Sequence, residues 1–193
     1  LIPWQELSQK TGAVLRFIPI TDDGRLNFTA ELINEKTRIV ALTQQSNILG
    51  TINDVSGIAV LAHAVGAKVV VDACQSVPHM SVNVDAIGAD FFAFSGHKML
   101  GPLGVGVLWI KDIDDVPVFI TGGSMIESVY LDHSTYAKGP QRFEAGTMMV
   151  SQAVGLAAAV KYLNAIGMDA IGAHEHHLTG LAIQSLQEIP GVT

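Results

Sequence analysis

The chain has 193 residues, of which 49% are hydrophobic and 15% charged, a balance that supports a buried core and an α/β domain. Its net charge of −7 includes no basic stripe, which excludes nucleic-acid binding by phosphate neutralisation. The single cysteine, Cys74, excludes an internal disulfide framework and favours a cytoplasmic protein. The apolar run at 58–71 is interrupted and too short to span a bilayer, so no membrane partner is expected.

The first 110 residues alternate between helical patterns and short β-branched runs. Helices are expected at 3–11 and 55–65. Strands are expected at 14–20, 38–43, 68–71 and 91–94. This alternation is typical of βαβ units around a mostly parallel sheet with helices on both faces. The run 104–110 follows Gly101-Pro102 too closely for a crossover helix and predicts an antiparallel neighbour.

The pattern loosens into a loop region over 112–142, and two long helices are then expected at 151–166 and 168–189. We interpret 1–150 as a large ligand-binding domain and 151–193 as a linker helix with the start of a small domain. The absence of an initiator Met and the abrupt ends suggest a segment of a longer protein, incomplete at both ends.

Open α/β sheets bind ligands beyond the carboxyl ends of their strands. The polar side chains that follow three of the predicted strands are Asn47, then Asp72 and Gln75, then Ser95, His97 and Lys98. An amine, a carboxylate and hydrogen-bond donors at one edge suit pyridoxal 5′-phosphate (PLP).

Each group meets a need of that cofactor. Lys98 can form a Schiff base with the aldehyde. Asp72 can stabilise the proton on the pyridine nitrogen by charge pairing. Ser95 and His97 can bind the phosphate, and Gln75 can hydrogen-bond the phenolic oxygen. Asn47 can serve the same oxygen.

The motif at 95–106, SGHKMLGPLGVG, resembles the PLP-lysine motif of class V aminotransferases, and more narrowly that of cysteine desulfurases and selenocysteine lyases. Segments 46–51, 71–75, 122–126 and 142–147 match the same subgroup in order and at nearly its spacing. One such motif is weak evidence, but five in register are strong. The resemblance covers essentially the whole chain.

The resemblance implies the large domain of a fold-type I PLP enzyme that removes sulfur or selenium from cysteine or selenocysteine to give alanine. Lys98 would hold PLP and move a proton, with Asp72 at the pyridinium nitrogen and Gln75 at the phenolic oxygen. Ser95 and His97 would bind the phosphate, and Asn47 would lie near the phenolic oxygen and the substrate carboxylate.

In this family Gly146 and Thr147 reach the phosphate of the other subunit's cofactor, which implies a homodimer. The sulfur would pass to an acceptor protein, for instance in iron–sulfur cluster assembly. The family's ring-stacking His, its phosphate loop, its persulfide-forming Cys and its substrate-binding Arg match no position between Leu1 and Thr193.

Simpler interpretations exist for several of these residues. Lys98 could be a surface lysine, Asp72 could cap a following helix, and Gln75 and Asn47 could satisfy only local backbone groups. Cys74 is better interpreted as a small buried apolar residue than as a nucleophile.

The remaining histidines and glycines favour structural roles. His79 is expected to make a structural hydrogen bond rather than act as a base. His174 and His177 share a helix face, but solvent exposure is favoured over a metal site because no further ligands accompany them. The glycines at 101–106 precede a strand, so they are not a dinucleotide fingerprint. Another class V activity, or a catalytically incomplete fragment with a binding role, stays open as an alternative.

Overall fold

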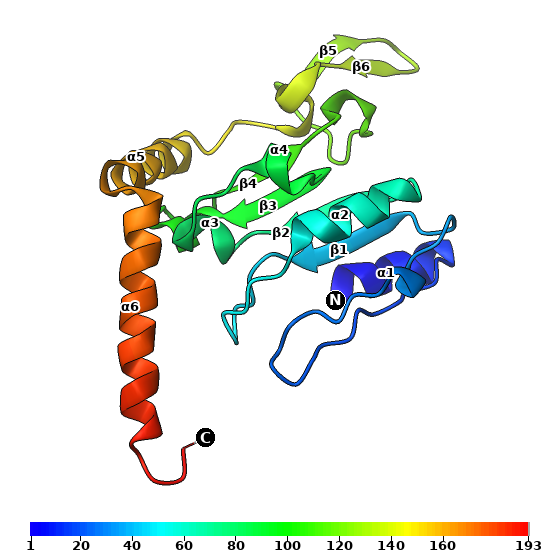
Figure 1. Ribbon diagram of the computed structural model, residues 1–193. Helices are drawn as coiled ribbons and strands as arrows, with labels where there is room; N and C mark the ends of the chain where they lie inside the picture. The colour runs from blue at the N-terminus through cyan, green and yellow to red at the C-terminus, as the bar shows by residue number, and fades with distance from the viewer. Residues whose placement is uncertain (193) are drawn as a thin grey trace.

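The computed structural model describes residues 1–192. Its centre is a four-stranded sheet in the order β1 (Ile39–Thr43), β2 (Lys68–Asp72), β3 (Phe91–Ser95) and β4 (Gly106–Ile110) (Figure 1). β1, β2 and β3 are parallel, and β4 runs antiparallel to β3. The predicted parallel sheet and its antiparallel neighbour are therefore confirmed.

Helices and short turns connect these strands and continue the chain beyond them. Before β3 they are α1 (Ile2–Thr11), η1 (Ala30–Leu32), α2 (Val55–Ala64), α3 (Ser76–His79) and α4 (Val84–Ile87). After β3 they are η2 (Gly96–Met99), η3 (Ile113–Asp115), η4 (Gly139–Phe143), α5 (Val150–Ile166) and α6 (Met168–Gln187). Two further strands, β5 (Ile126–Val129) and β6 (Ser134–Tyr136), lie between η3 and η4. The helices expected at 3–11, 55–65, 151–166 and 168–189 are thus confirmed to within two residues at each end.

The crossover helix α2 begins and ends where local chemistry dictates. The Asp54 side chain accepts a hydrogen bond from the Gly57 backbone N–H at 2.9 Å, which caps the first turn. Beyond the helix, Gly66 adopts a φ of +77°, a conformation that glycine tolerates at little cost. These two features fix the ends of α2, and β2 begins two residues after Gly66.

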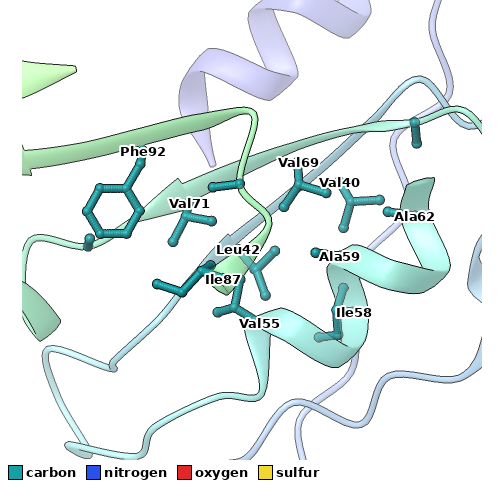
Figure 2. Packing of buried hydrophobic residues seen from close by; sticks show 13 residues of the cluster. Val40, Leu42, Val55, Ile58, Ala59, Ala62, Val69, Val71, Ile87 and Phe92 are labelled. Carbon is teal, nitrogen blue, oxygen red and sulfur yellow. The ribbon is translucent and has the colours of Figure 1, made fainter. Parts of the chain in front are cut away.

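The core lies between α2 and the sheet (Figure 2). Val69 and Val71 of β2 are fully buried, as expected for a central strand covered by a helix. They meet residues spaced three or four apart on α2, namely Val55, Ile58, Ala59 and Ala62. This packing holds the strand order, and with it the positions of the strand ends.

The strand predicted at 14–20 is wrong. This segment makes only one isolated bridge, between Ile20 and Leu26. Val14 is 88% exposed, and a groove of about 770 Å³ separates the segment from β1. A β-branched sequence forms a strand only where a ladder partner is available, and Pro19 removes one donor as well.

The loop expected at 112–142 contains a hairpin, β5–β6, that projects beyond the sheet (Figure 1). Its strands have three and four residues and lack a clear apolar alternation, which explains why the sequence pattern missed them. From α5 the chain turns by 76° into α6, a long helix with no buried residue. Among residues 1–192, no single helix is long and apolar enough to cross a membrane.

Candidate functional site

The carboxyl ends of β1, β2 and β3 lie side by side. Thr43 pairs with Asp72, and Asp72 pairs with Ala93, two residues before the end of β3. Backbone hydrogen bonds continue past the strands, since the Gln44 N–H donates to the Asp72 carbonyl at 2.9 Å. The loops that carry the predicted cofactor residues on β2 and β3 therefore start from one edge of the sheet.

Lys98 lies in η2, the short helix directly after β3. The backbone here is tightly packed: the Gly96 N–H donates to the Val105 carbonyl at 2.8 Å, and a Cβ on Gly96 would lie 2.8 Å from the same oxygen. Leu100 ends η2 with a φ of +60°. Lys98 itself is half-buried and, within residues 1–192, forms no hydrogen bond or ion pair. A positioned amine without a protein partner is what a covalent cofactor attachment requires.

Asp72 follows the last buried residue of β2 and is exposed at the sheet edge. Its Oδ1 accepts a hydrogen bond from the Cys74 backbone N–H at 3.0 Å. The residue that caps α3 is Gln75, so the alternative in which Asp72 caps the following helix is wrong. In the described part of the chain no cation pairs with Asp72, and its carboxylate can receive a positively charged ring nitrogen.

The β2 and β3 ends also contact each other through side chains. Cys74 Sγ lies 3.4 Å from Ser95 Oγ, and both residues are half-buried. Cys74 is therefore only partly buried, and its thiol contacts the Ser95 hydroxyl. His97 is exposed one residue before Lys98. Hydroxyl and imidazole donors next to the amine suit a phosphate group.

Gln75 and Asn47 stand apart from these contacts. Gln75 is half-buried, whereas Asn47 is exposed in the loop after β1. That loop is shaped by Ser46, whose Oγ accepts hydrogen bonds from the backbone N–H groups of Ile48 and Leu49 at 3.3 and 3.2 Å. Among the described residues, Asn47 makes no hydrogen bond to Asp72 or Lys98.

Gly146 and Thr147 lie in the loop between η4 and α5. The Gly146 N–H donates to the Gly123 carbonyl at 2.8 Å, which joins the motif at 142–147 to the motif at 122–126. Gly146 has a φ of +90°, and Thr147 is exposed. No hydrogen bond within residues 1–192 links either residue to Lys98 or Asp72.

Two glutamines at the end of β1 received no role from the sequence. The Oε1 atoms of Gln44 and Gln45 are buried and have no hydrogen-bond partner among the described residues. The Thr43 hydroxyl donates to the Gln45 carbonyl at 2.9 Å and fixes the turn that carries them. Consecutive polar residues after a buried strand were the available signal, but amides at strand ends most often satisfy only local backbone groups.

The histidines take structural positions. His79 Nδ1 lies 3.0 Å from both carboxylate oxygens of Glu175, as a structural hydrogen bond requires. His174 and His177 are exposed on α6. Residues 1–192 contain no cluster of three or more His, Cys, Asp or Glu side chains that could hold a metal ion.

The family model described as aminotransferase class-V matches residues 1–193. The probable cysteine desulfurase of Streptomyces coelicolor is 54% identical over 98% of the chain and 46% of its own length. The cysteine desulfurase of Dickeya dadantii is 49% identical over 98% of the chain and 47% of its own length. The chain thus spans about half the length of the curated relatives it matches.

Solved structures agree with the sequence comparison. The apo cysteine desulfurase from Thermococcus onnurineus NA1 superposes with a TM-score of 0.90 at 42% identity, covering 97% of the chain and 48% of that structure. The cysteine desulfurase CsdA (S-sulfonic acid) from Escherichia coli gives a TM-score of 0.94 at 35% identity, covering 99% of the chain and 49% of that structure. The expected fold class is confirmed.

Proposed function

Since the chain belongs to the aminotransferase class-V family, we propose that it forms the cofactor-binding part of a PLP-dependent cysteine desulfurase. The observation that supports this proposal most directly is that an amine and a carboxylate, each without an ionic partner among the described residues, lie at neighbouring strand ends. Lys98 and Asp72 extend from neighbouring strand ends, and neither has an ionic partner within residues 1–192. If Lys98 and Asp72 served only to form structural ion pairs, each would have an oppositely charged protein partner. Their lack of such partners in the described chain favours a ligand that needs an amine and a carboxylate together.

The donor set fits PLP residue by residue. Lys98 Nζ would attach to the cofactor's aldehyde carbon, and Asp72 would face the protonated ring nitrogen. Ser95 and His97 would donate to the phosphate, with Gln75 and Asn47 at the phenolic oxygen. The last two assignments rest on the family resemblance, since within residues 1–192 neither side chain hydrogen-bonds another predicted cofactor residue.

The chemistry divides between the cofactor and the protein. When bound, PLP supplies an electron sink for negative charge that develops on the substrate's α-carbon. Asp72 would keep the ring nitrogen protonated, and Lys98, once released by the incoming amino group, would carry a proton at Nζ. The substrate would be cysteine or selenocysteine: its sulfur or selenium would pass to an acceptor thiol, and the remainder of the substrate would leave as alanine.

A second copy of the chain is part of the proposal. Within residues 1–192 no hydrogen bond links Gly146 or Thr147 to this chain's own Lys98, and the resemblance assigns both residues to the phosphate of a partner's cofactor. We therefore propose a homodimer with sites at the interface, acting in the cytoplasm and passing sulfur to an acceptor protein. We also propose that 1–150 is the PLP-binding domain and that 151–193 leads to a small domain; Thr193 lies outside the described residues.

Borohydride trapping tests the cofactor site. PLP added to the protein should produce a yellow species, and reduction should fix the cofactor to the peptide that contains Lys98. Lys98→Ala should abolish this labelling, whereas Lys161→Ala, which removes an exposed lysine on α5, should leave it unchanged. A colourless protein, or equal labelling of Lys98→Ala, would refute the assignment.

Sulfide release from cysteine, assayed with a reducing thiol such as dithiothreitol that supplies the two electrons needed to free the sulfur as sulfide, separates the activities. We expect release by a protein that also contains the remaining half of the relatives' length, and little release by residues 1–193 alone. Transamination or epimerisation without sulfide would favour another class V activity. PLP binding without any turnover in the longer protein would favour a binding or structural role.

A further inference from the structure

One contact outside the cofactor residues joins distant parts of the chain. His79 is the last residue of α3 and Glu175 lies in the second turn of α6, 96 positions later. Both Glu175 oxygens lie 3.0 Å from His79 Nδ1, and both side chains are half-exposed, at 39% and 42%. Because an ionised carboxylate only accepts hydrogen bonds, Nδ1 must be the donor.

The backbone confirms that α6 lies directly on the end of α3. Gly172, one turn before Glu175, would place a Cβ 3.3 Å from the His79 carbonyl oxygen. That distance is tighter than ordinary van der Waals contact, so a side chain at 172 would push the helices apart. The close backbone approach at Gly172 and the His79–Glu175 contact are two separate features of the same α3–α6 interface, which we call the joint.

α3 is firmly embedded on its other side. Ser76 and Pro78 are buried, and the Val77 N–H donates to the Ala73 carbonyl at 3.1 Å. The helix starts four residues after Asp72, and it packs against η2, which carries Lys98, as well as against α6. α3 therefore lies between α6 and both of the charged groups assigned to the cofactor.

We propose that His79 is a positioning residue: by binding Glu175 it holds α6 against α3 and so fixes the Asp72 loop and the Lys98 turn in their binding geometry. This inference rests on the proposed function for its effect on the cofactor. It adds a role for α6, none of whose own residues is buried.

In the described chain, the His79 side chain hydrogen-bonds Glu175 and none of the other titratable side chains on the elements packed against α3. The titratable side chains on the elements packed against α3 are His97 and Lys98 on η2, and Asp169, His174, Glu175, His176 and His177 on α6. Within residues 1–192, Glu175 alone hydrogen-bonds the His79 side chain. A change at either partner should therefore act through this pair.

Two measurements on one set of variants test the proposal. In His79→Ala and Glu175→Ala, amide hydrogen exchange should speed up about threefold or more, both in α6 and in the segments at 72–79 and 96–101. The PLP dissociation constant should rise by about three- to tenfold, and the double variant should be no worse than either single one. His177→Ala, an exposed histidine on the same helix, should match the wild type.

A swapped pair distinguishes positioning from simple loss of packing. His79→Glu alone opposes two carboxylates and should weaken PLP binding, and adding Glu175→His should restore most of the affinity. Faster exchange confined to α6, with unchanged PLP affinity, would overturn the proposal, because the contact would then hold α6 in place without affecting the cofactor residues. So would failure of the swap to restore affinity in a folded protein. If the wild type bound no PLP, the proposed function would fail, while exchange at 72–79 and 96–101 would still test the joint.

Discussion

His63 lies on α2 and Asp90 directly precedes β3, yet Asp90 Oδ2 lies 2.8 Å from His63 Nε2. The same carboxylate binds Lys68 Nζ at 2.9 Å and accepts the Val69 backbone N–H at 2.8 Å. Asp90 is 4% exposed and precedes β3, at the opposite end of the sheet from Lys98. One buried carboxylate thus joins the end of α2 to the starts of β2 and β3, at the edge of the sheet opposite the predicted cofactor residues.

Removing that carboxylate should destabilise the fold. Asp90→Ala leaves the buried Val69 N–H without an acceptor, and we expect the free energy of unfolding to fall by about 2 kcal/mol. Urea denaturation followed by circular dichroism measures the change. Asp112→Ala removes only the exposed partner of Lys68 and should cost less than about 0.5 kcal/mol. Equal effects of the two variants would contradict the role of Asp90.

The same group predicts a dependence of stability on pH. Burial acts to raise the pKa of Asp90, but hydrogen bonds from His63, the Val69 N–H and Lys68 outweigh it, and the pKa lies below its ordinary value. A depressed pKa contributes stability above the unfolded-state value of about 3.9, and this contribution is lost as pH falls through the folded-state pKa. Unfolding free energies measured below about pH 4 should therefore decline less steeply in Asp90→Asn than in the wild type.

Gly96 should not tolerate a side chain. A Cβ there would lie 2.8 Å from the Val105 carbonyl oxygen and 2.9 Å from Val105 Cγ1, so Gly96→Ala should displace the Lys98 turn and cost about 1–3 kcal/mol. PLP titration should show weaker binding as well. Gly123→Ala is a matched control because a Cβ at that position meets nothing within 4 Å. Normal PLP binding by Gly96→Ala would show that the turn is less constrained than its contacts indicate.

Asp72→Asn tests the charge at the ring nitrogen. The amide keeps the size of the side chain but cannot stabilise a positive charge, which typically shifts a neighbouring pKa by about 1–3 units. We expect covalent attachment at Lys98 to persist and turnover in the longer protein to fall by roughly tenfold or more. Asp132→Asn, at an exposed aspartate beside the β5–β6 hairpin, should have no effect. Full activity of Asp72→Asn would rule out the ring-pairing role.

The sequence predicted elements wherever local pattern and tertiary partner agreed. β2 was predictable because its valines are buried against a helix whose own spacing matches, and the position of Lys98 directly after a strand was predictable because its motif follows the apolar run that forms β3. The segment at 14–20 carried an equally good β pattern but has no ladder partner. Propensity alone could not reveal that.

Long-range side-chain pairs were beyond the sequence for a different reason. His79 and Glu175 are 96 positions apart, and Asp90 is 27 from His63, so no local periodicity links them. Their positions follow from helix packing and from the order of the strands. The buried Gln44 and Gln45 oxygens likewise became visible only once the strand ends were in place.

The groove beside β1 has a practical consequence. β1 is the outermost strand of the four-stranded sheet, and its free edge faces the apolar segment at 14–18 across that groove. An uncovered strand edge offers hydrogen bonds to any extended chain that reaches it. Residues 1–193 produced alone should therefore become more prone to association as concentration rises, and short charged or proline-containing changes at that edge are where solubility can be improved.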